Sequence, residues 1–461
     1  MTTRSFLRSF LGLAVSTSVV AFPAIAGAQE WLKDRRFSEG AGVRAGDFEI
    51  HPGVGAEIGY DSNWLLRSYR TGFQNSAPAA PEKGAGMLRI TPSISIQTLS
   101  AARRKDQGEG GAQPMVELRA TAAATYREFF GDSELTKQRN IGANLDVRAD
   151  IAPRRPFGFS LFGGVSRIPR PNTGADPNQA FDSDNVYGGG EFNIAPGGGT
   201  FDMHAGYTLN ATFFEKLSGK PFDNIRHEIA VRNRWRFRPR TALFSETSLG
   251  FQNYSNPNGA ATVLTNSTPL RTRFGVNGLV GPRVAFLGAV GYGASFYALG
   301  AKTTQQYDSV IGQAELRFYL TDNPDTSELG KVSLTQSSLT VGYTRDFQNS
   351  FLGDVYGVDK GYGTLSYFFG ARVLTSATAA VSNLSFKNVF LADGSVAASS
   401  FNVVRPEITL YGEYRFSDTI AMNLTANYSQ NVTSQSIKYP EGSFDLAWRR
   451  AQVFLGGRFF L

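Results

Sequence analysis

The chain contains 461 residues, of which 41% are hydrophobic, and it carries a formal net charge of +7. It has no cysteine, which excludes disulfide bonds, cysteine-ligated metal sites and an acylated cysteine anchor. A positive charge balance is also typical of nucleic-acid-binding proteins, but here the arginines are dispersed and form no basic arm. We therefore expect no nucleic-acid partner.

The first 28 residues have the three parts of a secretory signal peptide. Arg4 and Arg8 precede an apolar stretch at 10–20. Small residues, Ala-Gly-Ala at 26–28, then form the cleavage site. The protein is therefore expected to leave the cytoplasm and to lose residues 1–28.

The rest of the chain is expected to form one domain. Residues 29–48 are mixed in charge and rich in glycine, and we expect them to be a periplasmic lead-in that is too short to plug a transporter barrel. No linker and no change of composition interrupts residues 49–461. This part nowhere approaches the ~20 apolar residues that a membrane helix needs. Any crossing of a membrane must therefore use strands.

Apolar and polar residues alternate through the whole domain. Ile141 and Leu145 lie on one face of such a segment, and Asp146 and Arg148 lie on the other. The segments are about as long as the ~9–11 residues that a tilted strand needs to cross a bilayer. Their number is even, as single-chain bacterial barrels require. The pattern predicts an all-β, transmembrane, antiparallel up-and-down β-barrel of about eighteen strands, at 50–60, 88–99, 116–126, 140–151, 157–165, 185–194, 201–213, 225–237, 243–251, 270–280, 284–296, 310–320, 337–345, 361–372, 375–386, 404–416, 420–428 and 447–461.

The connections between these segments alternate in length. Short, turn-like connections are expected at 152–156, 195–199, 238–240, 281–283 and 417–418. Longer, polar ones are expected at 61–87, 169–184, 255–269, 346–360 and 432–445. Bacterial barrels have short periplasmic turns and long outward loops. We therefore expect the outer membrane of a Gram-negative bacterium, with both chain termini in the periplasm.

Aromatic residues cluster near the ends of the expected strands, as in the girdles that lie at the two headgroup levels of such barrels. The outer girdle is expected to contain Tyr60, Tyr126, Phe213, Tyr254, Phe296, Tyr343 and Tyr428. The inner girdle is expected to contain Phe157, Phe237, Phe286, Phe318 and Phe416.

The last strand ends in a pattern that resembles the signal by which outer-membrane barrels are inserted. Gly456 is followed by apolar residues at the third and fifth positions after it, Phe459 and Leu461. Two positions depart from the pattern: Phe454 stands where a polar residue is usual, and a terminal Phe is commoner than Leu461. The alternative is an amphipathic edge strand, but an edge this hydrophobic is a hazard in water unless it is paired.

Charged residues on the polar faces are expected to line a wet lumen, because each would cost about 2–4 kcal/mol on the lipid face near the midplane. The densest group is a basic stripe along the pore: Arg226, Arg232, Arg234, Arg236, Arg271 and Arg273. One interpretation is a rail for anionic solutes or polymers. The alternative is that arginines and acids pair across neighbouring strands and stiffen the wall. The sequence leaves both open.

Little in the sequence favours catalysis. Histidines are scattered: His51 and His204 are expected to face the lumen, and His227 to face lipid near a strand end. Lipid hydrolases built on barrels use a Ser-His pair on the outer wall, but no Gly-x-Ser-x-Gly element accompanies His227. We expect no enzyme, no catalytic residue, no cofactor and no metal.

The first strand ends in Gly59-Tyr60-Asp61-x-Asn63. This motif resembles the opening of the family called outer-membrane β-barrel porin 2, and the segment at 39–48 resembles myxobacterial relatives of that family. The resemblance implies a barrel that exports exopolysaccharide. It carries no agreed catalytic residues.

The sequence therefore predicts an outer-membrane channel, and the resemblance points to exopolysaccharide as its substrate. The alternative is a passive diffusion porin for small hydrophilic solutes, including anionic ones. An outer-membrane lipid hydrolase and a surface adhesin scaffold stay as further alternatives. The expected partners are outer-membrane lipid, the barrel-insertion machinery, the polysaccharide or solute itself, and periplasmic components of polysaccharide export.

Overall fold

A computed structural model describes most of the chain after the predicted lead-in. The described residues are 42–70, 82–99, 114–137, 140–153, 155–169, 182–215, 217–256, 260, 262–297, 306–320, 337–350, 352, 354–369, 372–417, 419–439 and 442–461. The predicted signal peptide and most of the predicted lead-in lie outside them. Within these residues, the structure has no helix that is long and apolar enough to span a membrane.

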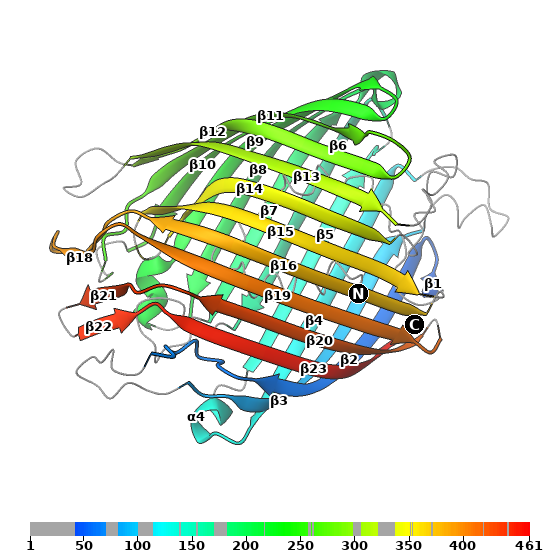
Figure 1. Ribbon diagram of the computed structural model, residues 1–461. Coiled ribbons are helices and arrows are strands. Elements are labelled where there is room, and N and C mark those ends of the chain that lie inside the picture. The colour runs from blue at the N-terminus through cyan, green and yellow to red at the C-terminus, as the bar shows by residue number, and fades with distance from the viewer. Residues whose placement is uncertain are drawn as a thin grey trace.

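Eighteen antiparallel strands form a closed barrel, which confirms the predicted fold (Figure 1). Each strand pairs with the next along the chain, and the last pairs with the first. Their bounds are β2 Phe48–Asp61, β3 Ala85–Thr98, β4 Val116–Phe130, β5 Asn140–Ile151, β6 Phe157–Ile168, β7 Ser183–Ile194, β8 Phe201–Phe214, β9 Asn224–Arg238, β10 Thr241–Tyr254, β11 Ser267–Leu279, β12 Val284–Tyr297, β13 Tyr307–Tyr319, β14 Ser338–Asn349, β15 Val355–Phe369, β16 Val373–Phe386, β19 Phe401–Arg415, β20 Ile420–Asn431 and β23 Trp448–Phe460.

The alternation in the sequence sets the two faces of the wall. On β5, Leu145 is 44% exposed on the outer surface, whereas Asp146 accepts a hydrogen bond from the hydroxyl of Tyr187 on the lumen side. Large apolar side chains are exposed in this way on the outer face of strand after strand. Proteins that stay in water rarely expose contiguous apolar patches beyond a few hundred Å². The barrel is therefore a transmembrane one, whose outer face meets lipid.

The two aromatic girdles have one exception among their predicted members. Tyr60 and Tyr343 near the loops, and Phe157 and Phe416 near the turns, are exposed on the outer face. The prediction for Tyr254 is wrong: it is buried and faces the lumen, because Phe251 faces outward and the alternation then turns Tyr254 inward.

The barrel has two distinct ends. We call one of them the terminal end, because the C-terminus lies there. It also carries β1 (Val43–Ala45), which pairs with β2, and the 3-10 turn η2 (Pro196–Gly199). The other, the loop end, carries small elements that the sequence did not predict (Figure 1). These are α4 Ser133–Thr136, η3 Leu217–Phe222, the hairpin of β17 Val389–Phe390 with β18 Val396–Ala398, and the hairpin of β21 Ser436–Tyr439 with β22 Gly442–Asp445.

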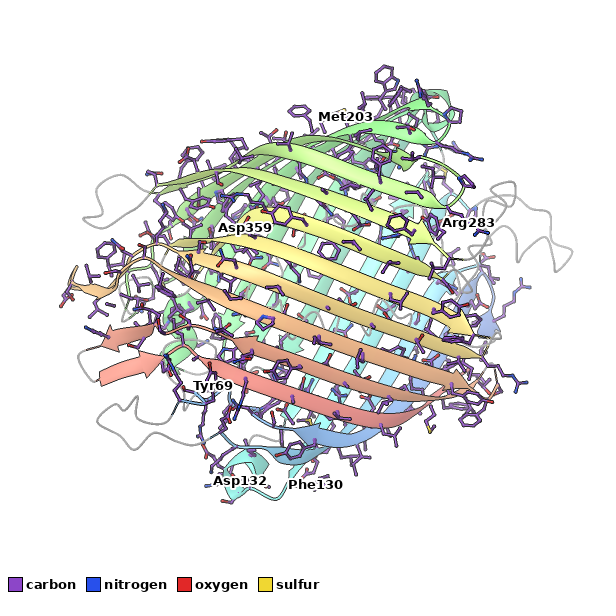
Figure 2. The ribbon with its side chains drawn as sticks, viewed as in Figure 1. Tyr69, Phe130, Asp132, Met203, Arg283 and Asp359 are labelled. Atoms are coloured by element: carbon purple, nitrogen blue, oxygen red, sulfur yellow. The ribbon has the colours of Figure 1, made fainter. Side chains whose placement is uncertain are left out.

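One predicted loop is much shorter than expected. Strand β14 continues to Asn349 and β15 begins at Val355, so most of residues 346–360 is wall instead of loop. The polar residues there misled the prediction because they satisfy one another on the outer face. Arg345 lies 3.1 Å from Asp359, which is labelled in Figure 2.

The seam between β2 and β23 is locked by the motif at the end of the first strand. The ring of Phe454 lies over Gly59, where a Cβ atom would stand 2.4 Å from it. Asp61 binds Arg450, and Asn63 donates a 2.9 Å hydrogen bond to the carbonyl of Arg449. Ser62 N also donates to Ala451 O at 2.9 Å. The motif thus joins the first strand to the last.

Candidate functional site

The candidate site is the lumen. A barrel of 16–18 strands is wide enough to leave an aqueous channel, whereas small barrels are filled by their own side chains. The lumen faces of the strands carry charged, amide and hydroxyl side chains, as the alternation predicts. On β20, for example, Asn423, Thr425 and Asn427 succeed one another on the lumen side and alternate with outward Met422 and Leu424. The lumen side of this strand is therefore polar, although Asn423 and Thr425 are themselves buried.

The predicted basic stripe lies on the lumen side of β9 and β11, and three of its four arginines on β9 have carboxylate neighbours. Arg226 Nη2 lies 2.5 Å from Glu228 Oε2. Arg232 forms an ion pair with Glu191, two strands away on β7. Glu191 also lies 3.0 Å from the ring of His204.

Two more members of the stripe, Arg234 and Arg273, are neutralised in a similar way. Arg234 lies 2.8 Å from Asp202. Arg273 Nε donates to Glu246 at 2.6 Å. The backbone N–H of Arg236 donates to Thr200 in the turn at the terminal end. This pairing favours the wall interpretation of the stripe, because a paired arginine attracts passing anions much less than an unpaired one.

The side chain of the last arginine of the stripe reaches along the lumen side to another strand of the wall. Arg271 on β11 donates to Asp346 at 3.1 Å and to the carbonyl of Phe347 at 2.7 Å, both on β14. These contacts pass over β12 and β13. The Phe347 ring covers Gly293 of β12, where a Cβ would meet it at 2.6 Å. The end of β14 therefore leans into the lumen.

The side chain of Asn349 makes further contacts that hold the end of β14 in the lumen. Asn349 Nδ2 lies within hydrogen-bond distance of Gln252 Oε1, at 2.6 Å, and of Ser267 Oγ, at 2.9 Å. Ser267 belongs to β11 and Gln252 to β10, so β14 reaches past two intervening strands to the first and past three to the second. The lumen is therefore narrowed on this side of the loop end.

Two loops also meet at the loop end, in a contact that we call the strap. Thr262, between β10 and β11, forms a β-bridge with Leu391, between β16 and β19. Val263 N donates to Phe390 O at 2.9 Å. Strands β10 and β16 stand six positions apart in the eighteen-strand order, so the strap spans about a third of the rim.

Each side of the strap is anchored by its own apolar cluster. One contains Ala260, Leu264, Phe214, Phe222 and Tyr254. The other contains Val389, Leu391, Ala397, Ala398, Ile437 and Leu446, from the two small hairpins. Each loop thus has its own packing, and among the described residues one β-bridge joins the two.

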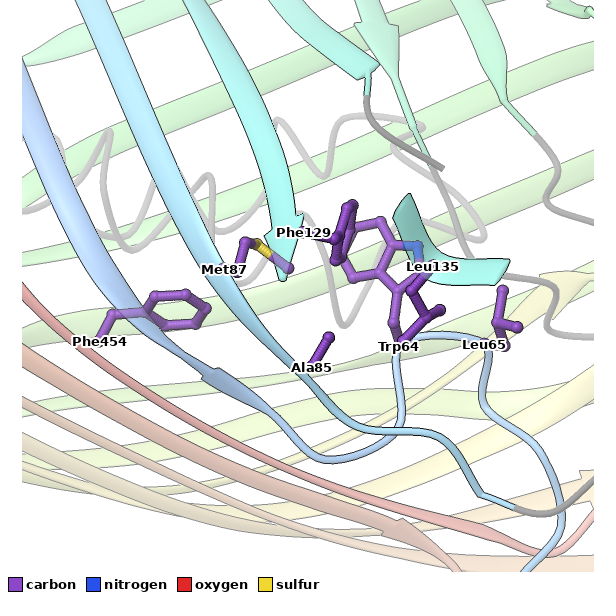
Figure 3. Packing of buried hydrophobic residues seen from close by; sticks show 7 residues of the cluster. All are labelled: Trp64, Leu65, Ala85, Met87, Phe129, Leu135 and Phe454. Carbon is purple, nitrogen blue, oxygen red and sulfur yellow. The ribbon is translucent and has the colours of Figure 1, made fainter. Parts of the chain in front are cut away.

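The opposite side of the loop end is packed around Trp64 (Figure 3). Its ring lies edge-on to Phe129 at a centroid distance of 5.1 Å and close to Leu135 of α4. Lys83 lies 2.8 Å from Glu134 in the same helix. Hydrogen bonds from Lys83 and then Arg67 hold the pKa of Glu134 below its ordinary value.

The sequence considers catalysis only at His227, and the structure shows the surroundings of this residue. His227 lies on the outer face as predicted, and its Nδ1 lies 2.7 Å from the hydroxyl of Tyr207. Its cross-strand neighbours are Leu209 and Phe251, not a serine. No group of three or more His, Asp or Glu side chains in the described part of the chain could hold a metal ion.

The predicted insertion signal lies at the seam. Gly456 faces Glu57 and Asn423 on its two neighbouring strands. Phe459 is exposed on the outer face, and Leu461 N donates to Pro52 O at 3.0 Å. The last residues therefore belong to the wall and do not project from it.

No protein-family model and no curated protein matches the chain. Among solved structures, the chain is similar to the copper transporter OprC, with 10% identity, a TM-score of 0.41 and coverage of 91% of this chain and 81% of that one. It is similar to the FrpB iron transporter from Neisseria meningitidis at 8% identity and a TM-score of 0.42, over 94% of this chain and 83% of that one. It is also similar to a variant of the ferric enterobactin receptor PfeA from Pseudomonas aeruginosa, with 11% identity and a TM-score of 0.46. That similarity covers 89% of this chain and 81% of that one.

Proposed function

We propose that the protein is a channel in the outer membrane of a Gram-negative bacterium, with both termini in the periplasm, and that it conducts a hydrophilic substrate. The observation that carries this proposal is the contrast between the two faces of a closed eighteen-strand wall, apolar outside and polar inside. A barrel of this size leaves a water-filled path. We assign it no catalytic role.

We further propose that the substrate is an exported exopolysaccharide. The resemblance of Gly59-Tyr60-Asp61-x-Asn63 to the porin 2 family supports this substrate. The paired stripe is also compatible with a polymer, because alternating charges and amides can bind hydroxyl groups along a chain without trapping ions of one sign. The alternative is a diffusion porin for small solutes.

Purified protein in planar bilayers tests the channel. We expect stepwise ionic conductance that a soluble oligosaccharide added to one side blocks reversibly. A folded barrel that gives no conductance would overturn the channel, and conductance that no oligosaccharide blocks would favour the small-solute porin. Heat-modifiable mobility in gels shows that the barrel is folded.

A further inference from the structure

Three arginines face the lumen on neighbouring strands near the loop end, and two of them have carboxylate partners. Arg89 Nη2 lies 2.9 Å from Glu57 Oε2. Arg450 Nη2 lies 2.5 Å from Asp61 Oδ2. The third, Arg127 on β4, is only 9% exposed, and its Nη1 has no hydrogen-bond partner. Among the described residues, no carboxylate forms an ion pair with it.

Arg127 lies near two other arginines, each of which has its own carboxylate partner. It stands directly opposite Arg89 in the β3–β4 register, and like charges in that position repel each other. The charge of Arg450 adds to this repulsion, and Asp182 attracts Arg127 only at a distance. A buried charge without a partner is unfavourable, whereas an anion at this place would complete the set of ion pairs.

The neighbouring strand lets the guanidinium lie close against its backbone. Gly142 of β5 lies beside Arg127, and a Cβ atom at Gly142 would stand 2.9 Å from Nη1. Any larger residue there would press on the guanidinium. Arginine presents a planar fork of donors that matches the two oxygens of a carboxylate or phosphate.

We propose that Arg127 is an oxyanion-binding site in the lumen, and that it takes a carboxylate or phosphate group of the solute that passes through the channel. This inference rests on the proposed channel function. It assigns acidic groups to the substrate, a property that the paired stripe on β9 does not require.

Binding to the folded barrel in detergent tests the site without any transport. The probes are a galacturonate trimer, inorganic phosphate and neutral galactose, and the measurements are the dissociation constant and the temperature at which heat-modifiable mobility is lost. We expect wild-type protein to bind galacturonate or phosphate and to be stabilised by it, with no effect of galactose. Whichever oxyanion binds more tightly identifies the acidic group.

The variants are Arg127→Gln, Gly142→Ala and the control Arg119→Gln. Arg119 lies on the same strand as Arg127, and its replacement changes the net charge by the same amount. Its partner Asp150 stays paired with Arg148 at 2.8 Å, so no carboxylate is left unpaired. We expect R127Q to weaken binding at least about tenfold, or about 1.4 kcal/mol. G142A should weaken it too, and R119Q should leave it unchanged.

The proposal is overturned by wild-type protein that binds neither oxyanion, or by folded R127Q that binds as tightly as wild type. An equal loss in R119Q would also overturn it, because the effect would then be that of net charge. If R127Q fails to fold, Arg127→Lys keeps the charge without the fork and should bind more weakly than wild type. A conducting channel that binds no oxyanion separates failure of this site from failure of the proposed function.

Discussion

Asp61 on β2 accepts hydrogen bonds from both the Nε and the Nη2 of Arg450 on β23, at 3.0 and 2.5 Å to Oδ2, so that a buried ion pair joins the first barrel strand to the last. Gln452 donates to the same carboxylate at 2.6 Å. Asp61 is fully buried, and Arg450 is 6% exposed. Closure of the barrel therefore depends on polar contacts as well as on the strand ladder.

Breaking this pair should open the seam. We expect Asp61→Ala to destabilise the barrel by about 3–5 kcal/mol, because it leaves the guanidinium of Arg450 buried without a partner. The measurement is the temperature at which the heat-modifiable gel shift is lost. The double variant D61A/R450M should recover part of the loss, since it removes both charges. Equal destabilisation by the single and double variants would contradict this account.

Locking the strap should restrict passage. The chain has no cysteine, so the variant Thr262→Cys/Leu391→Cys can form only the intended intramolecular bridge, and residues paired in a β-bridge have a suitable separation for one. We expect oxidised protein to exclude polymers that the reduced protein admits, if the strap opens during passage. Thr364→Cys/Thr378→Cys, which links two neighbouring strands, is the control. Equal polymer passage before and after oxidation would show that the strap does not open.

The pairing of the basic stripe predicts weak ion selectivity. Because Arg226, Arg232 and Arg234 each have a carboxylate partner, the reversal potential in a KCl gradient should be close to zero for wild-type channels. Arg232→Gln alone should shift it toward cations by uncovering Glu191, and R232Q/E191Q should restore it. A strong anion preference in wild type, lost in R232Q, would instead support the rail.

The alternation on β5 predicts which face meets lipid. Leu145→Arg should destabilise the inserted barrel by roughly 2–4 kcal/mol, because an arginine near the midplane faces hydrocarbon. Asp146→Asn should have a small effect, since Tyr187 can still donate to the amide oxygen. Unfolding of the two variants in lipid vesicles provides the comparison. A larger loss in D146N than in L145R would reverse the assignment of the faces.

Much of the wall could be predicted from the sequence, because a two-residue period assigns each side chain to lipid or lumen without any knowledge of the partner strand. Leu145, Asp146 and His227 show this. Contacts between distant segments could not be predicted in this way. Thr262 and Leu391 are 129 residues apart, by subtraction of their numbers, and no local pattern marks their bridge.

The same limit explains the errors. The extension of β14 and β15 was missed because Arg345 and Asp359 look like loop residues until their pairing across the strands is known. The absence of a carboxylate partner for Arg127 could not be predicted either, since it depends on strand register. The motif at Gly59 to Asn63 suggested a family, and the structure gives it a physical role in closing the seam.

The most direct test of the proposed function is the amount of polysaccharide on the surface of cells that lack this chain. We expect deletion to abolish the surface polymer while uptake of small hydrophilic solutes continues, and complementation with the wild-type chain to restore the polymer. An intact surface polymer together with slower uptake of small solutes would contradict export and would identify the barrel as a diffusion porin.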